Sequence, residues 1–199
     1  MIAVLDYGMG NLRSVSRALE RVGGQPEITS DPDVAARADA LVVPGVGAFG
    51  ACVRGLRASK LDRAIVDFAE AERPVLGVCL GMQVLFDASE EDDDDGLSLL
   101  KGTVRRLPPS VKVPHMGWNE VEWKEDHPFV RGIPSGTRFY FVHSFAPDPN
   151  PEFTVGETDY GRRFAAVVAR GSVFATQFHP EKSGEPGLAL YEAFVKEVA

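Results

Sequence analysis

Two different hydrophobic patterns divide the chain. Up to about residue 90, short apolar runs alternate with segments in which apolar residues recur every three or four positions. This alternation predicts strands at residues 2–5, 26–29, 40–43 and 74–78, and helices at 12–22, 49–56, 61–70 and 81–86. Asp31 followed by Pro32 predicts the start of a further short helix. Strands that alternate with helices over short connections are typical of a parallel sheet covered on both faces.

Residues 102–173 follow another pattern, rich in Thr, Val, Phe and Tyr, with turn residues between short runs. This pattern predicts mostly antiparallel strands at 103–107, 120–123, 138–143, 154–157 and 163–169. A buried strand at 172–177 and an amphipathic helix at 187–198 follow. Because no repeat or linker interrupts the chain, we expect one α/β domain over residues 1–199. Its sheet should be open and mostly parallel, with flanking helices and an antiparallel portion.

The composition argues against several classes of protein. The 199 residues are 44% hydrophobic and 25% charged, and the net charge of −8 disfavours a nucleic-acid partner. No apolar run is long enough to cross a membrane, and the N-terminus lacks the pattern of a secretory signal. Two cysteines are too few for a disulfide framework, so we expect a cytoplasmic protein with a free thiol.

The segment around Cys79 carries the clearest chemical signal. Gly77 and Gly81 flank it, between a predicted buried strand and a predicted helix. Glycines suit a sharp strand-to-helix turn that would hold the sulfur at the carboxyl end of the sheet, where open α/β sheets place their sites. A helix N-terminus there favours the thiolate, which is the nucleophilic form. Without further support, a lone cysteine is more often a small buried apolar residue.

His179 and Glu181 follow the last predicted strand in a Gln-Phe-His-Pro-Glu segment. A thiol nucleophile needs an imidazole to take and return its proton, and the imidazole needs an acceptor that orients it. If the segment stays extended, residues 179 and 181 point to the same side. His-Pro-Glu alone is weak support, since a His-Pro turn is common at a strand end. Together with Cys79 about a hundred residues upstream, it predicts a Cys–His–Glu triad.

A glycine-rich turn, Pro44-Gly45-Val46-Gly47, ends the third predicted strand. Such a turn can aim backbone N–H groups at a developing oxyanion, although by itself it reads as a plain strand–helix turn. This glycine-rich turn, the sharp turn at Cys79 and the His-Pro-Glu segment follow one another along the chain. In that order they resemble the motifs of the class I, or triad, glutamine amidotransferases. One branch, the glutaminase subunits of imidazole glycerol phosphate synthases, is similar from Ile2 to the final helix. That similarity is carried by the segments 6–14, 44–47, 115–119 and 140–144.

The resemblance implies a flavodoxin-like fold and a role for each matching residue. Cys79 attacks the side-chain amide carbon of glutamine, His179 acts as base and then acid, and Glu181 orients His179. Backbone N–H groups near Gly47 and Leu80 form the oxyanion hole, after a rearrangement of the glycine-rich turn that couples turnover to a partner. The substrate's amino-acid end is held by Gln83, Glu91, Ser144 and Phe145, the last two mainly through their backbone.

The resemblance also implies a partner. The ammonia passes to a (β/α)-barrel synthase subunit, which makes imidazole glycerol phosphate and an aminoimidazole carboxamide ribotide for histidine biosynthesis. Asn11, Arg13 and Trp118 match the docking face, with an ordinary core or surface aromatic as the alternative for Trp118. We expect no cofactor, because the glycine-rich turn at residues 6–11 lacks dinucleotide-binding spacing and no Walker-type loop occurs.

Several other polar residues invite weaker interpretations. His115 and His143 lack metal-ligand spacing, so we expect hydrogen-bonded structural or interface histidines and no metal. Cys52 lies on a helical pattern and is interpreted as packing. The acidic run at 90–95 is typical of a solvated loop, with a cation site as the alternative.

Three other functions remain open at this point. The chain could serve a different amidotransferase, such as pyridoxal phosphate synthase, although segments 9–14 and 115–119 favour the histidine branch. It could be a binding module without activity on the same fold, although all three triad residues are present. It could be a stand-alone cysteine peptidase of similar fold, which Gln83 and His-Pro-Glu disfavour.

Overall fold

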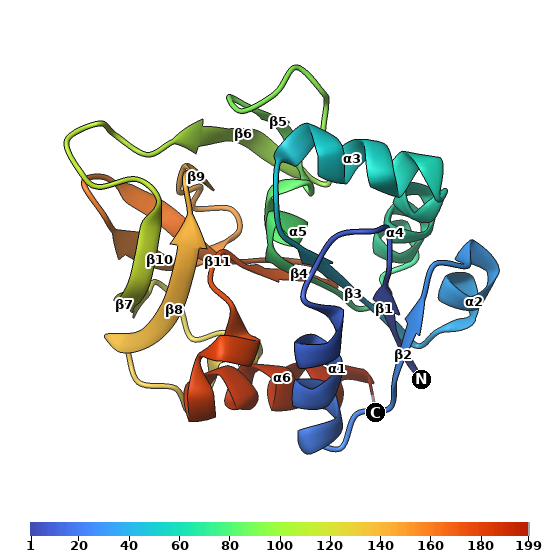
Figure 1. The fold of residues 1–199 in the computed structure, drawn as a ribbon. Helices are drawn as coiled ribbons and strands as arrows, with labels where there is room; N and C mark the ends of the chain where they lie inside the picture. The colour runs from blue at the N-terminus through green and yellow to red at the C-terminus, as the bar shows by residue number, and fades with distance from the viewer. Residues whose placement is uncertain (199) are drawn as a thin grey trace.

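The computed structural model describes residues 1–198 and contains a nine-stranded sheet with helices on both faces (Figure 1). Five strands form a parallel part: β1 (Ile2–Leu5), β2 (Pro26–Thr29), β3 (Ala40–Gly45), β4 (Val75–Cys79) and β12 (Val173–Thr176). The antiparallel part continues from β12 through β11 (Arg163–Arg170), β10 (Thr154–Asp159), β7 (His115–Trp123) and β8 (Thr137–His143). The strand order is β2-β1-β3-β4-β12-β11-β10-β7-β8. The expected mixed sheet is therefore confirmed.

Helices cover the two faces of the parallel part because successive strand residues point to opposite sides. Val4 of β1 belongs to the apolar cluster beneath α1 (Leu12–Arg21) and α6 (Gly184–Val198). Leu5 belongs to the cluster beneath α3 (Phe49–Ala58) and α4 (Leu61–Glu70). The two helix pairs lie on opposite sides of the sheet in Figure 1. The short helix α2 (Pro32–Arg37) begins as expected, with the Asp31 side chain accepting the N–H of Asp33.

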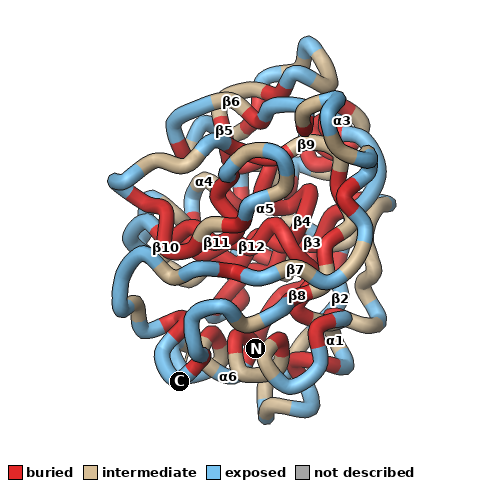
Figure 2. Tube along the Cα trace, turned by 90° about the vertical axis from the view of Figure 1, so that its left-hand side faces the viewer, coloured by how far each residue is buried: buried red, intermediate tan, exposed pale blue. Residues whose placement is uncertain are grey.

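The central strands are buried on both faces. Every residue of β1, β3, β4 and β12 is buried, and Figure 2 shows the buried residues gathered along the middle of the sheet. Such strands read as continuous apolar runs, which explains why the sequence located them closely.

The prediction of a helix at residues 81–86 is wrong beyond Gln83. Helix α5 spans only Leu80–Gln83, and β5 (Phe86–Ser89) follows. The carbonyl oxygens of Val84 and Leu85 accept N–H groups from Leu97 and Leu100. These distant hydrogen bonds draw the chain away from the helix, and apolar periodicity alone cannot show them.

A second, three-stranded sheet was not predicted as a unit. It pairs β5 with β6 (Leu100–Arg106) and β9 (Phe145–Pro147). Strand β7 begins at His115, five residues earlier than expected, because it pairs with β8 along its length. Two short 3₁₀ helices, η1 (Pro128–Val130) and η2 (Pro180–Lys182), complete the elements.

Candidate active site

Cys79 ends β4 in a strained backbone conformation and leads directly into α5. Its φ of 55° and ψ of −109° are rare for a residue with a side chain. Gly81 makes the bend possible, since a Cβ there would overlap the carbonyl oxygen of Val43. The sharp turn expected from the sequence is present, and it leaves Cys79 6% exposed. Because α5 has only four residues, less helix dipole acts on the sulfur than the longer predicted helix would supply.

The parallel pairing of β4 brings two other segments to the sulfur. Gly45 of β3 is the register partner of Cys79, so the glycine-rich turn emerges beside it. On the other side, Thr176 of β12 pairs with Val78, and the chain reaches His179 three residues later. Three segments far apart in the sequence therefore meet at one edge of the sheet.

His179 and Glu181 are in contact, but through a different backbone path from the one we expected. Nδ1 of His179 lies 2.8 Å from Oε1 of Glu181. The segment does not stay extended, because Pro180–Lys182 forms the 3₁₀ helix η2. One tight turn, with Ser183 Oγ donating to the His179 carbonyl oxygen, places the carboxylate behind the ring.

The surroundings of His179 favour its protonated form. Burial opposes a charge on the ring, but its interactions with Cys79 and with the Glu181 carboxylate outweigh burial and raise its pKa to about 10. Glu181 holds Nδ1. The other nitrogen, Nε2, is buried and makes no hydrogen bond within residues 1–198, so it is available for proton transfer at the cavity that His179 and Cys79 both line.

A cavity of about 340 Å³ opens over Cys79, within the size range of small-molecule sites. Most of the site residues predicted from the sequence line this cavity. Its lining includes Gly47, Cys79, Leu80, Gln83, Glu91, Ser144, Phe145 and His179, together with Val46, Pro114, Val142, His143 and Lys182. Glu181 lies behind His179 and is not part of the lining.

The residues expected to hold the substrate differ in how much of each side chain is free. Both amide hydrogens of Gln83 are used, because Nε2 donates to the Phe145 carbonyl oxygen at 2.8 Å and to Gln177 Oε1 at 3.0 Å. Oε2 of Glu91 accepts the N–H of Phe49 at 2.9 Å. Ser144 contributes a backbone carbonyl that accepts from Leu107. Glu91 and Ser144 keep further acceptor positions in the cavity wall.

The glycine-rich turn is packed against the turn that follows β1. A Cβ on Gly47, whose φ is 107°, would overlap the Met9 side chain. The Tyr7 hydroxyl donates to the Pro44 carbonyl oxygen and accepts from Cys52 Sγ at 3.2 Å. Cys52 is fully buried, which agrees with its interpretation as a packing residue.

The three residues expected at a docking face lie at the surface or close to it. Trp118 is 55% exposed, which removes the core alternative, and its ring lies 6.1 Å from that of Tyr140. Met116, two residues earlier on β7, is 64% exposed and was not singled out from the sequence. Arg13 is exposed on α1, and the Asn11 side chain makes no hydrogen bond to the helix that it precedes.

The two remaining histidines of interest are buried and bonded to each other. His115 Nδ1 lies 2.9 Å from His143 Nε2, and His143 Nδ1 lies 2.9 Å from the Phe145 carbonyl oxygen. Burial lowers the pKa of His115 to about 4, and burial together with His115 lowers that of His143 to about 3. Both rings are therefore neutral near pH 7, and both are hydrogen-bonded, as expected.

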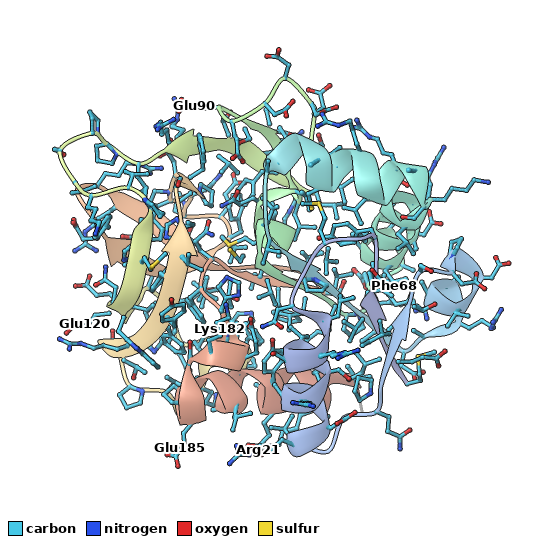
Figure 3. The ribbon with its side chains drawn as sticks, viewed as in Figure 1. Arg21, Phe68, Glu90, Glu120, Lys182 and Glu185 are labelled. Atoms are coloured by element: carbon cyan, nitrogen blue, oxygen red, sulfur yellow. The ribbon has the colours of Figure 1, made fainter. Side chains whose placement is uncertain are left out.

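The acidic run is more structured than a solvated loop. Arg54 of α3 forms an ion pair with Asp94, and Arg105 of β6 pairs with Glu90 at 3.1 Å. Glu90 is labelled at the top of the molecule in Figure 3. Within residues 1–198, no group of three or more His, Cys, Asp or Glu residues is placed to hold a metal ion.

Sequence reasoning missed two polar residues close to Cys79 and His179. Lys182 lines it and lies 5.8 Å from the centre of the Tyr140 ring; Figure 3 labels it above α6. Gln177 is fully buried, and its side chain reaches Cys79. Both flank the His-Pro-Glu segment, so their position next to the triad was the available signal.

Comparison with known proteins gives concordant results. A family model described as glutamine amidotransferase class-I matches residues 3–198. The imidazole glycerol phosphate synthase subunit HisH of Dehalococcoides mccartyi strain CBDB1 is 48% identical over 198 residues, covering 98% of this chain and 97% of that protein. The HisH subunit of Moorella thermoacetica is 49% identical over 195 residues, covering 97% and 93%.

Solved structures agree on the fold. The structure of PurLQS from Thermotoga maritima matches with a TM-score of 0.76 at 22% identity, over all of this chain and 98% of that chain. No helix among residues 1–198 has both the length and the apolar character that a membrane crossing requires.

On the family match and the identity to two HisH subunits, the chain belongs to the class-I glutamine amidotransferases, in the branch of the imidazole glycerol phosphate synthase subunit HisH.

Proposed function

We propose that this chain hydrolyses glutamine to glutamate and ammonia with Cys79, His179 and Glu181. The observation that carries the proposal is that Cys79 and the His179–Glu181 segment, about a hundred residues apart in the sequence, meet at one cavity. The sulfur sits on a strained turn, the imidazole follows the neighbouring strand, and the carboxylate holds the far side of the ring at 2.8 Å. This is the arrangement that a thiol nucleophile needs.

The reaction follows from these positions in two steps. His179 takes the proton of the Cys79 thiol, and the sulfur attacks the side-chain amide carbon of glutamine. His179 then gives that proton to the departing nitrogen, which leaves as ammonia. Neutral His179 then takes a proton from water, and the resulting hydroxide attacks the γ-glutamyl thioester. Glutamate leaves, and the sulfur is restored. Glu181 stabilises the charged ring in both steps.

The other cavity residues would bind the substrate. Backbone N–H groups at Gly47 and Leu80 are the proposed oxyanion donors, on the two turns that flank the sulfur. Glu91 supplies a carboxylate suited to the substrate's ammonium group, while Gln83, Ser144 and Phe145 line the wall nearby. The resting turn is held by Tyr7 and packed against Met9, so its rearrangement would require movement of that packing.

The chain would deliver its ammonia to a synthase subunit. The HisH relatives are named as subunits of imidazole glycerol phosphate synthase, and we propose the same heterodimeric role here, with a (β/α)-barrel partner. Exposed Trp118, with Arg13 and Asn11, is the proposed docking face. The partner would convert the ammonia into imidazole glycerol phosphate and an aminoimidazole carboxamide ribotide. We propose one glutaminase domain over residues 1–199, acting in the cytoplasm.

Substitution of the nucleophile tests this function. Cys79→Ala, assembled with the synthase subunit, should lose glutamine-dependent synthesis and keep synthesis from added ammonium. The matched control is Cys52→Ala, which removes the other thiol from a site behind β3 and should keep both activities. Loss of the ammonia-dependent reaction in Cys79→Ala would contradict separate glutaminase and synthase sites. Full glutamine-dependent activity in that variant would contradict the nucleophile.

A further inference from the structure

The carbonyl oxygen of Phe145 fixes the orientation of a buried polar chain beside the sulfur. A carbonyl only accepts, so the group of Gln83 that lies 2.8 Å from it must be the amide nitrogen. The second hydrogen of that nitrogen is directed to Gln177, 3.0 Å away, so Gln177 must present its oxygen there. The remaining end of the Gln177 amide, the N–H donor, then faces Cys79 Sγ at 3.8 Å.

The same carbonyl fixes the two histidines. Nδ1 of His143 lies 2.9 Å from the Phe145 oxygen and must carry the proton, which leaves Nε2 to accept from His115. The Asn119 side-chain nitrogen donates in turn to His115 Nε2, at 3.3 Å. The oxygen of Phe145 therefore accepts two hydrogen bonds, one from Gln83 and one from His143. None of these groups is free to turn around.

The sulfur has two polar contacts with opposite preferences. Its distance to the Val142 carbonyl oxygen is 3.9 Å, a contact that suits a thiol, because the S–H donates. The N–H of Gln177 suits a thiolate, because the sulfur accepts. Both contacts are long, but Cys79 is 6% exposed and Gln177 is fully buried, and a polar group has a larger effect at a buried site than in water.

We propose that Gln177 is a further catalytic residue of the glutaminase site, whose side-chain N–H stabilises the reactive thiolate of Cys79, with Gln83 as the residue that positions it. The inference rests on the proposed function. It assigns Gln83 a task besides lining the substrate cavity. Its physical basis is that the Gln177 amide is fully buried and bonded at both ends, so its dipole is held in one direction before the substrate binds.

The other ionisable groups near the sulfur influence the Cys79 thiol equally in the wild-type protein and in a Gln177 variant. These groups are His179, Glu181, His143, Glu91 and Lys182 around the cavity, and Tyr7 and Cys52 behind β3. Replacing an uncharged amide by an uncharged side chain leaves all of them in place. A change in the pH dependence of the thiol can therefore be traced to the lost N–H.

Gln177→Met keeps the volume and removes the donor. The test is the rate at which iodoacetamide alkylates Cys79 in the full-length chain, determined as a function of pH. Peptide mass spectrometry identifies the alkylated residue. The midpoint of that profile should move up by about one pH unit, so that labelling falls about tenfold at pH values below both midpoints and recovers at high pH. In the complex, glutamine turnover should show the same loss in kcat with little change in KM.

Controls separate this effect from general damage. Gln25→Met makes the same replacement at an exposed residue whose carbonyl oxygen accepts from Ile2, the first residue of β1, at the end of the strand far from Cys79. This variant should leave the alkylation profile unchanged. Gln177→Asn keeps an amide but withdraws it from the sulfur, and serves if the Met variant does not fold. A folded variant of Gln177 with the wild-type pH profile would overturn the inference. Absence of glutamine hydrolysis in the wild-type complex, with a normal alkylation shift, would instead overturn the proposed function.

Discussion

His179 Nδ1 and Glu181 Oε1 lie 2.8 Å apart across a single turn of 3₁₀ helix, with both side chains almost completely buried. The turn is short and proline-led, so the carboxylate has little freedom to leave the ring. In a buried site an ionised carboxylate is a strong partner for an imidazolium. This pair therefore controls both the orientation and the charge of the proposed catalytic base.

Glu181→Gln should weaken catalysis more than substrate binding. An amide can still accept from Nδ1, but it no longer stabilises positive charge on His179. We expect glutamine hydrolysis by the complex to fall roughly 100-fold in kcat, since orienting carboxylates in triads have effects of this order or larger. KM should change little, because Glu181 does not line the cavity.

The matched control for this substitution is Glu185→Gln. Glu185 is exposed in the first turn of α6 and is labelled at the lower edge of Figure 3. It should retain wild-type turnover. Near-normal kcat in Glu181→Gln would show that the carboxylate charge is not used.

The meeting of the three proposed triad residues was predictable because each carries a local signal. Gly77 and Gly81 mark the sharp turn at Cys79, and an imidazole with a nearby carboxylate marks the acid–base pair. The route between His179 and Glu181 was not predictable, because it depends on Ser183 capping the His179 carbonyl and on η2 packing against α6. A tertiary contact there overrides the expectation of an extended segment.

In the fold, too, some elements were predictable from the sequence and others were not. Strands buried on both faces, such as β3 and β4, are continuous apolar runs and were located to within two residues. Strand β5 was missed, and its first residue, Phe86, was assigned to a helix, because its pairing partner lies more than ten residues away at Leu100–Arg106. The exposed Met116 beside Trp118 was missed because exposure depends on the pairing of β7 with β8.

Tyr7→Phe should destabilise the protein by about 1–3 kcal/mol. The hydroxyl is the donor to the Pro44 carbonyl oxygen and the acceptor for the Cys52 thiol, and all three groups are buried. Urea unfolding of the chain measures this change. Tyr160→Phe is the control, because its hydroxyl donates to the Lys112 carbonyl oxygen at a more accessible site where water can replace it. Equal losses in the two variants would contradict a special role for the Tyr7 contact.

Trp118→Ala should weaken binding of the synthase subunit and leave folding almost unchanged. Trp118 is 55% exposed, so its truncation should change the free energy of unfolding by no more than about 0.5 kcal/mol. An exposed Trp at an interface contributes roughly 2 kcal/mol or more, which corresponds to about a 30-fold rise in Kd by titration calorimetry. Ile28→Ala, at 41% exposure on the opposite edge strand β2, should leave Kd unchanged. An unaffected Kd in Trp118→Ala would remove this residue from the docking face.

The buried pair His115–His143 should make the fold sensitive to acid. Burial, followed by the neighbouring His115, lowers the pKa of His143 to about 3, whereas an unfolded histidine titrates near 6.5. Above about pH 6.5 both states are neutral, and the contribution of His143 to stability is fully present. As the pH falls from 6.5 toward 3, the unfolded state takes up a proton that the folded state does not, so stability decreases. The slope contributed by this one residue is about 1.4 kcal/mol per pH unit.

His143→Asn removes that titrating group and retains a donor for the Phe145 carbonyl oxygen. The variant should be less stable at pH 7, because the contact with His115 is lost, yet its free energy of unfolding should fall less steeply between pH 6 and pH 4. Urea unfolding at half-unit pH steps measures both slopes. An unchanged slope would mean that His143 accepts its proton in the folded state, and the fixed donor direction derived from Phe145 would then fail below neutral pH.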